Sequence, residues 1–285
     1  MTFETLDRFV IKTLENLENW KYPELPIKPS NKNVFLGSGS AACTGKLFAD
    51  KFGGIALNAS NYQTFFENSS GSDFASINII NASGGKDGIK MSEFLTAKGF
   101  EPNLMTCNPD PPAKAFIKQD NIFVFPALND PPTYNVSTYG SMIYCLFKEN
   151  PDEIKRFIAE ISVPNLRTYP YIFFLASDKY AAIAEMSSRK VAETLEGIGS
   201  NGDGSTNGSH GMLRQPNKNR LVICLNQKYE GGENVYNLDI DSYLGLMMSA
   251  YYIIGKNQTD TDTKNLLADY ENMSKKLGWK FNKVW

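Results

Sequence analysis

The chain has 285 residues, a net charge of −2, and apolar and charged fractions near the average for globular proteins. This length suffices for one large domain or two ordinary ones with buried cores. A net charge of −2 does not indicate a basic surface for nucleic acid, and no apolar run is long enough to span a bilayer. The first twenty residues are amphipathic and acidic, unlike a signal peptide. We therefore expect a cytoplasmic protein with neither nucleic acid nor a membrane as its partner.

The first half of the chain alternates strands with helices. An amphipathic helix is predicted over residues 2–20, before a proline-broken linker at 22–29. The predicted strands are 33–36, 55–57, 76–80, 103–107 and 121–125, and the predicted helices are 40–53, 61–67, 86–98 and 138–148. Such alternation with short loops indicates a parallel sheet flanked by helices, whose ligands bind at the carboxyl ends of the strands.

Two of these strands run directly into small Gly/Ser turns that open helices. The first turn is Gly37-Ser38-Gly39-Ser40-Ala41, and the second is Asn81-Ala82-Ser83-Gly84-Gly85-Lys86. Turns of this kind aim N–H and hydroxyl groups at one point, at the positive end of a helix dipole, which suits a phosphate group. Two of them in one parallel sheet could close around a single ligand, and a phosphosugar is the first hypothesis. The alternative is that Ser40 and Ser83 are only helix N-caps.

The second half of the chain roughly repeats this order. Its predicted strands are 171–176 and 221–226, and its predicted helices are 178–196, 241–254 and 263–277. Its first turn, Ala176-Ser177-Asp178, has no glycine and adds a carboxylate, which would repel an anion. We therefore expect one phosphate site, in a domain over residues 1–162, and a second domain over 163–285.

Histidine and cysteine limit the chemistry further. The segment 197–211 is predicted to be a flexible glycine-rich loop, and it ends with the only histidine, His210, which is either functional or a solvated loop residue. The four cysteines are far apart without a CxxC pair, which argues against a zinc site or a disulfide framework. We expect buried thiols and no metal.

The two turns and a third feature resemble the sugar isomerase (SIS) family of phosphosugar-binding domains, in its two-domain form. The family signatures Gly-x-Gly-Ser/Thr-Ser and Ser-x-Ser-Gly-x-Thr are similar to residues 37–41 and 81–86. The third feature is a helix with a glutamate followed by a His-Gly pair, which resembles Glu193 and His210-Gly211. The resemblance covers residues 30–270 and implies an α/β fold of two tandem doubly wound domains, each a parallel sheet flanked by helices.

This resemblance implies roles for particular residues. Glu193 would move a proton between C1 and C2 of the sugar through an enediol, with Glu196 as the alternative base, and His210 would open the sugar ring. The phosphate would be held by the turns, through Gly39, Ser40, Asn81, Ser83 and Lys86. No cofactor is needed. The resemblance also implies a homodimer in which the partner subunit supplies the histidine, with the active site at the subunit interface.

Three residues depart from the family pattern. Asn81 replaces a serine but can still donate through its amide, and Ala41 lacks a hydroxyl. Lys86 replaces a threonine and would either add a charge-assisted contact to the phosphate or face solvent. A lysine that closes the site in aminosugar synthase relatives has candidates by position only, Lys280 and Lys283.

The leading hypothesis is an isomerase that interconverts an aldose and a ketose of a hexose or aminohexose 6-phosphate. The family includes the isomerase half of glucosamine-6-phosphate synthase and bifunctional phosphoglucose/phosphomannose isomerases, and the His-Gly pair favours an aminosugar-processing member. The alternatives are a fructosamine-6-phosphate deglycase or aminosugar deaminase, and a phosphosugar sensor without catalysis. A dinucleotide-binding site is disfavoured, because Leu57 and Asn58 stand where its acidic residue is needed.

Overall fold

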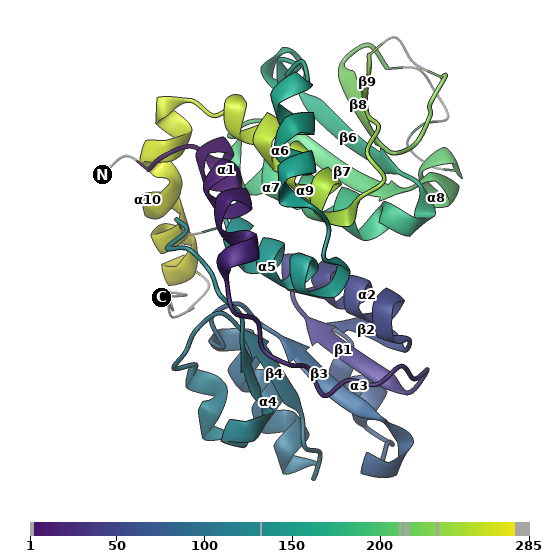
Figure 1. Ribbon diagram of the computed structural model, residues 1–285, viewed down its shortest axis with the longest axis vertical. Helices are drawn as coiled ribbons and strands as arrows, with labels where there is room; N and C mark the ends of the chain where they lie inside the picture. Colours follow the sequence, from purple (N-terminus) through teal and green to yellow (C-terminus); the bar gives the residue numbers. More distant parts are fainter. Residues whose placement is uncertain (1–2, 132, 211–212, 214–216, 232–233, 277–285) are drawn as a thin grey trace. The chain divides into compact units, whose positions relative to one another are not determined.

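The structure is a computed structural model, which describes residues 3–131, 133–210, 213, 217–231 and 234–276 (Figure 1). The chain divides into two compact units. The five-stranded unit holds residues 20–129, 141–146 and the described residues from 271 onward. The four-stranded unit holds the described residues of 1–19, 130–140 and 147–270.

The five-stranded unit is a parallel sheet with its helices. Its strands are β1 (Asn33–Gly37), β2 (Ile55–Asn58), β3 (Ser76–Ile80), β4 (Asn103–Thr106) and β5 (Ile122–Val124). The main helices are α2 (Ser40–Phe52), α3 (Tyr62–Phe66) and α4 (Lys86–Ala97), and α5 (Val136–Phe147) has residues in both units. The strand order is β2-β1-β3-β4-β5, and every neighbouring pair is parallel. The connections from β1 and β3 lead in opposite directions across the sheet, so the topological switch point lies between these two strands.

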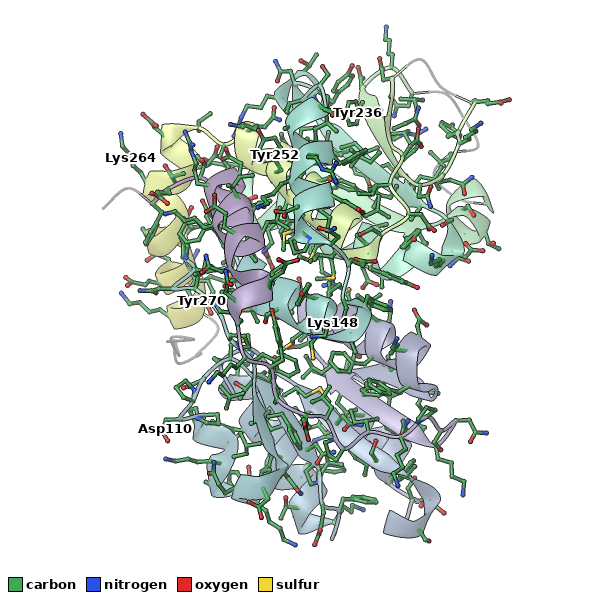
Figure 2. The ribbon with its side chains drawn as sticks, in the orientation of Figure 1. Asp110, Lys148, Tyr236, Tyr252, Lys264 and Tyr270 are labelled. Carbon is green, nitrogen blue, oxygen red and sulfur yellow. The ribbon has the colours of Figure 1, made fainter. Side chains whose placement is uncertain are left out.

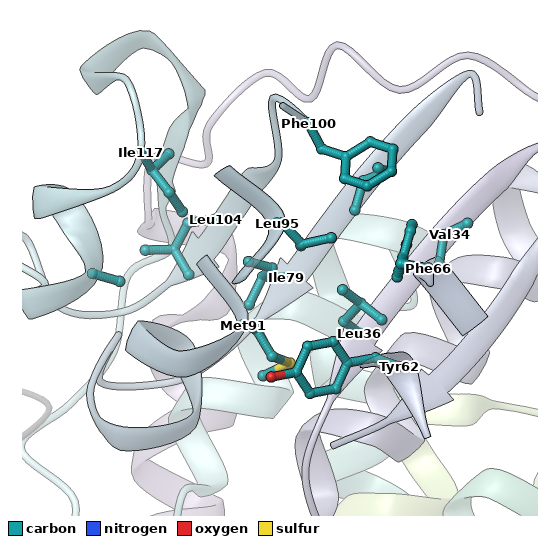
Figure 3. Close-up of a cluster of buried hydrophobic side chains, with 12 residues drawn as sticks. Val34, Leu36, Tyr62, Phe66, Ile79, Met91, Leu95, Phe100, Leu104 and Ile117 are labelled. Carbon is teal, nitrogen blue, oxygen red and sulfur yellow. The ribbon is translucent and has the colours of Figure 1, made fainter. Parts of the chain in front are cut away.

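The core of this unit explains why its strands read as nearly continuous apolar runs. All five residues of β1 are buried, as expected for a parallel strand covered on both faces. Apolar side chains of β1, β3 and β4 pack against side chains from α3 and α4 in one cluster (Figure 3). Its members include Val34, Leu36, Tyr62, Phe66, Ile79, Met91, Leu95, Phe100 and Leu104. Burial of each of the larger side chains contributes about 1.5–3 kcal/mol.

A polar ladder crosses the same sheet inside the core. Asn78 is fully buried in β3, and its amide nitrogen donates to the carbonyl oxygen of Val34 (3.2 Å) and to Ser76 Oγ (2.7 Å). The amide nitrogen of Asn103 donates to Asn78 Oδ1 (2.9 Å), and Ser76 Oγ donates to Asn33 Oδ1 (2.8 Å). The ladder therefore joins β1, β3 and β4 through side chains as well as through the backbone.

We expect Asn78→Leu to destabilise the protein by about 1–3 kcal/mol, because it removes the side-chain hydrogen bonds that Asn78 makes with the Asn103 amide and the Val34 carbonyl in the core. Urea unfolding measures this change. Asn121→Leu, on a half-exposed residue of the same unit, serves as a control for the change of residue type. Equal unfolding free energies for Asn78→Leu and the wild type would contradict the expectation.

The four-stranded unit contains a second parallel sheet. Its strands are β6 (Tyr171–Ala176), β7 (Gly199–Gly204), β8 (Arg220–Leu225) and β9 (Val235–Leu238), in the order β7-β6-β8-β9. Its helices are α1 (Leu6–Asn16), α6 (Pro151–Glu160), α7 (Ala181–Thr194), α8 (Ser205–His210), α9 (Tyr243–Lys256) and α10 (Asp260–Lys276), the last of which runs on past Tyr270 into the other unit's residues. Helix α7 packs on β6 and β7, and α1, α6 and α7 each contact α9.

Two charged side chains, one in each unit, illustrate the exposed surface. Asp110, in the loop after β4, and Lys264, on α10, both point outward (Figure 2). Among the described residues, no helix is long and apolar enough to cross a membrane.

The predicted α/β class, with parallel sheets flanked by helices, is confirmed. Helix α6 and strand β9 were not predicted. The prediction of a flexible loop over 197–211 was wrong, because residues 199–210 form β7 and α8. A Cβ atom on Gly202 would lie 2.1 Å from the Ala184 carbonyl oxygen. The glycine therefore permits the close approach of β7 to α7, and composition alone does not separate this role from flexibility.

Candidate functional site

The two Gly/Ser turns meet at the edge of the five-stranded sheet. They follow β1 and β3, which are neighbours with the register Asn33↔Ser76 to Leu36↔Ile79. A direct contact joins the turns, since Ser38 Oγ of the first donates to Asp87 Oδ2 at the start of α4 (2.7 Å). The prediction that the two turns lie close together is therefore confirmed.

The first turn places a buried serine at the start of a helix. Gly39 is the N-cap of α2 with φ +57°, in the left-handed region that favours glycine. Ser40 is the first residue of α2 and is buried. The backbone N–H groups of Ala41 and Ala42 donate to the carbonyl oxygens of Ser38 and Gly39 (both 3.1 Å).

The second turn holds its serine through backbone and amide groups. Ser83 Oγ accepts from the backbone N–H of Gly85 (3.2 Å) and donates to Asn81 Oδ1 (3.5 Å). The amide nitrogen of Asn108 donates to the Ser83 carbonyl oxygen (3.0 Å). Lys86 is the first residue of α4, and its half-buried side chain places Nζ 3.8 Å from Asp87 Oδ1.

The interpretation of the two serines as helix N-caps was wrong, because Gly39 and Gly85 occupy those positions. Asp87 is the residue of this site that the sequence analysis missed. The available signal was an acidic residue in the first turn of a helix, where the helix dipole favours it.

Glu193 lies on α7 in the four-stranded unit, beside a buried cation. Lys190 Nζ donates to Glu193 Oε2 (2.6 Å) and to the carbonyl oxygen of Thr133. The Lys190 side chain is only 1% exposed, whereas that of Glu193 is 39% exposed. The ring of Tyr251, which is fully buried, lies 5.3 Å from Lys190 Nζ. A buried lysine thus fixes a carboxylate that still reaches the surface of its unit.

Glu196, the alternative base, lies beyond the end of α7. Its backbone N–H donates to Asp262 Oδ1 (3.2 Å), and its side chain is exposed. Of the two candidates, Glu193 is therefore the one that a buried lysine holds in place.

The segment that contacts Lys190 contains a second buried carboxylate, Asp130. Its Oδ2 accepts from the backbone N–H of Ser137 (2.9 Å), and its Oδ1 has no hydrogen-bond partner among the residues that the structure describes. Burial raises the pKa of Asp130 to about 6, and hydrogen bonds from Ser137 and the charge of Lys190 offset part of this shift. Thr133 and Asn135 have φ +72° and +46°, so this segment holds two non-glycine residues in the left-handed region.

His210 belongs to α8, but its side chain and Gly211 lie outside the described residues, as do Lys280 and Lys283. The start of α8 is already occupied by a carboxylate of this chain. Asp178 accepts from the backbone N–H of Thr206 (3.0 Å), from its hydroxyl, and from Ser205 Oγ (3.4 Å). The Thr206 hydroxyl and N–H hold the pKa of Asp178 below its usual range. In the described part of the chain, no three His, Cys, Asp or Glu side chains gather closely enough to hold a metal ion.

No family model matches the sequence, and no curated protein matches it. Solved structures do match its fold. Tagatose-6-phosphate ketose/aldose isomerase from Escherichia coli is 14% identical, with a TM-score of 0.60 over 90% of this chain and 92% of that one. Glucosamine-6-phosphate deaminase from Thermotoga maritima is 13% identical, with a TM-score of 0.59 over 93% and 91%.

The C-terminal domain of glucosamine-fructose-6-phosphate aminotransferase from Francisella tularensis is 13% identical, with a TM-score of 0.60. The match covers 91% of this chain and 94% of that domain. The chain therefore shares the α/β fold of solved phosphosugar-processing proteins along most of its length.

Proposed function

We propose that this protein is a phosphosugar isomerase, which interconverts the aldose and ketose forms of a hexose or aminohexose 6-phosphate. The proposal depends most on the meeting of two Gly/Ser turns at the β1/β3 switch point, where the Ser38–Asp87 hydrogen bond joins them. Ligands of open α/β sheets bind at such a point. The names of the structures that share this fold, among them a tagatose-6-phosphate isomerase, support the same substrate class.

In the proposed site, Ser40, Ser83, Lys86 and the N–H groups around Gly39 bind the phosphate, with Asn81 in support. Each residue lies at the carboxyl end of β1 or β3 or at the start of the following helix. The starts of α2 and α4 contribute the positive ends of their dipoles. The phosphate thereby fixes one end of the sugar.

The proposed chemistry is a proton transfer. Glu193 removes the proton from C2 of the open aldose, and an enediol forms as the C1 carbonyl oxygen gains a proton. The same carboxylate returns the proton to C1 while the C2 hydroxyl releases its own proton and becomes the carbonyl, which gives the ketose. Lys190, whose Nζ donates to Glu193, orients the carboxylate for both steps. His210 is proposed to open the ring, with the partner subunit of a cytoplasmic homodimer supplying it.

We propose in addition that two tandem doubly wound SIS-type domains, residues 1–162 and 163–285, divide these tasks. The first would bind the phosphate and the second would supply the base. The likeness to glucosamine-6-phosphate deaminase favours one alternative reaction, removal of an amine from an aminosugar phosphate, which would use the same base. Assays for isomerisation and for released ammonia on the same ligands distinguish the two.

A thermal-shift screen tests the substrate class. We expect hexose or aminohexose 6-phosphates to stabilise the protein and the free sugars to leave it unchanged, with about 2.7 kcal/mol gained at a ligand concentration of 100 Kd. Ser83→Ala should remove most of this gain, because Ser83 Oγ lies in the second turn. Ser72→Ala, on an exposed serine of the same unit, is the control. Stabilisation that Ser83→Ala leaves intact would contradict the assignment of the turns.

A further inference from the structure

One carboxylate already contacts both turns that are proposed to bind phosphate. Asp87 is the second residue of α4, and its side chain is 27% exposed. Its Oδ2 accepts from Ser38 Oγ of the first turn (2.7 Å), and its Oδ1 lies 3.8 Å from Nζ of Lys86 in the second. An anionic group of this chain thus lies where the two turns meet.

The same positive groups stabilise the Asp87 carboxylate and a ligand phosphate. The start of α4 and the Lys86 ammonium stabilise either anion. A phosphate monoester carries about −1.5 to −2 charges at pH 7. Like charges within about 4–6 Å disfavour one another. Burial raises the pKa of Tyr62, and the Asp87 carboxylate raises it further, which is consistent with a negative field at this edge of the sheet.

We propose that Asp87 lowers the affinity of the two turns for any anion, so that inorganic phosphate alone binds too weakly to fill the site. A phosphosugar overcomes the opposition because its sugar adds contacts that free phosphate lacks. The inference rests on the proposed function in taking the turns as the phosphate site. A helix-capping role for Asp87 alone would leave the affinity for anions unchanged, so the two roles can be told apart.

Isothermal titration of the full chain with inorganic phosphate and with fructose 6-phosphate tests the inference. Asp87→Asn removes the charge and keeps an oxygen that accepts from Ser38. We expect it to tighten the affinity for both anions by about tenfold or more, the effect of one like charge at this range. Asp87→Ser is a second neutral variant that suits a helix start, in case the first folds poorly. Glu93→Gln removes an exposed charge further along α4 and should change either affinity less than twofold.

Two outcomes would overturn the inference. In one, the neutral variants bind inorganic phosphate no more tightly than the wild type does. In the other, neither they nor the wild type bind it at all. Failure of the proposed function would look different: the neutral variants would bind phosphate more tightly, but no hexose 6-phosphate would be turned over by any form of the protein.

Discussion

Glu193→Gln is expected to lower the turnover of the best phosphosugar substrate by about 10²–10⁴-fold, the usual contribution of a positioned general base. Glutamine keeps the length of the side chain and an oxygen that can accept from Lys190 Nζ, but it cannot take a proton at neutral pH. Binding should be unchanged, because the residues proposed to hold the phosphate belong to the five-stranded unit. Steady-state kinetics measures the loss, and the thermal shift with the same ligand measures the binding.

Two further variants are needed to interpret this result, a control and a test of the alternative base. Glu185→Gln changes a glutamate on the same helix that pairs with Arg189 (2.7 Å), and it should leave turnover within a few tenths of a log unit. Glu196→Gln tests the alternative base. Full activity of Glu193→Gln together with loss in Glu196→Gln would move the base to Glu196. Full activity of both would assign the base to another residue, whereas a wild type that binds phosphosugars without turning them over would leave a phosphosugar sensor as the better function.

Much of the fold followed from the order of apolar segments. Strand β3 was predicted at its observed bounds, 76–80, and β6 at 171–176, because buried parallel strands are short apolar runs between turn residues. The two turns were also predicted, since they lie within single short segments. The meeting of β1 and β3 as neighbours then follows from the usual topology of such sheets.

The features that were not predicted from the sequence depend on contacts between residues far apart in the chain. Asp130 lies on one segment and Lys190 on another, sixty residues apart in the sequence. Nothing local to either residue predicts that both are buried together, since lysine and aspartate are mostly exposed. Asp87 contacts Ser38 across two strands in the same way. β7 was missed because its glycines, which allow α7 to approach, have the composition of a flexible loop.

The buried Asp130 should make stability depend on pH in the direction opposite to that of an ordinary paired aspartate. Its pKa is about 6 in the folded protein, whereas an unfolded aspartate has a pKa of about 3.9. Between these values the folded state binds the extra proton. The stabilisation is therefore fully present below about pH 4 and is lost as the pH rises through 6. The difference of about two pKa units corresponds to about 3 kcal/mol.

Asp130→Asn isolates this effect. Asparagine can still accept from the Ser137 N–H, but it does not titrate, so the variant should gain about 3 kcal/mol relative to the wild type between pH 4 and pH 8. Urea unfolding of both proteins across this range measures the gain, and other titrating groups cancel in the difference. For Asp178→Asn, the difference in unfolding free energy from the wild type should change with pH in the opposite direction, because Thr206 holds the pKa of Asp178 below its usual range. If the Asp130→Asn difference is constant with pH, then Lys190 compensates the buried charge fully, and Asp130, Lys190 and Glu193 form one permanently ionised group.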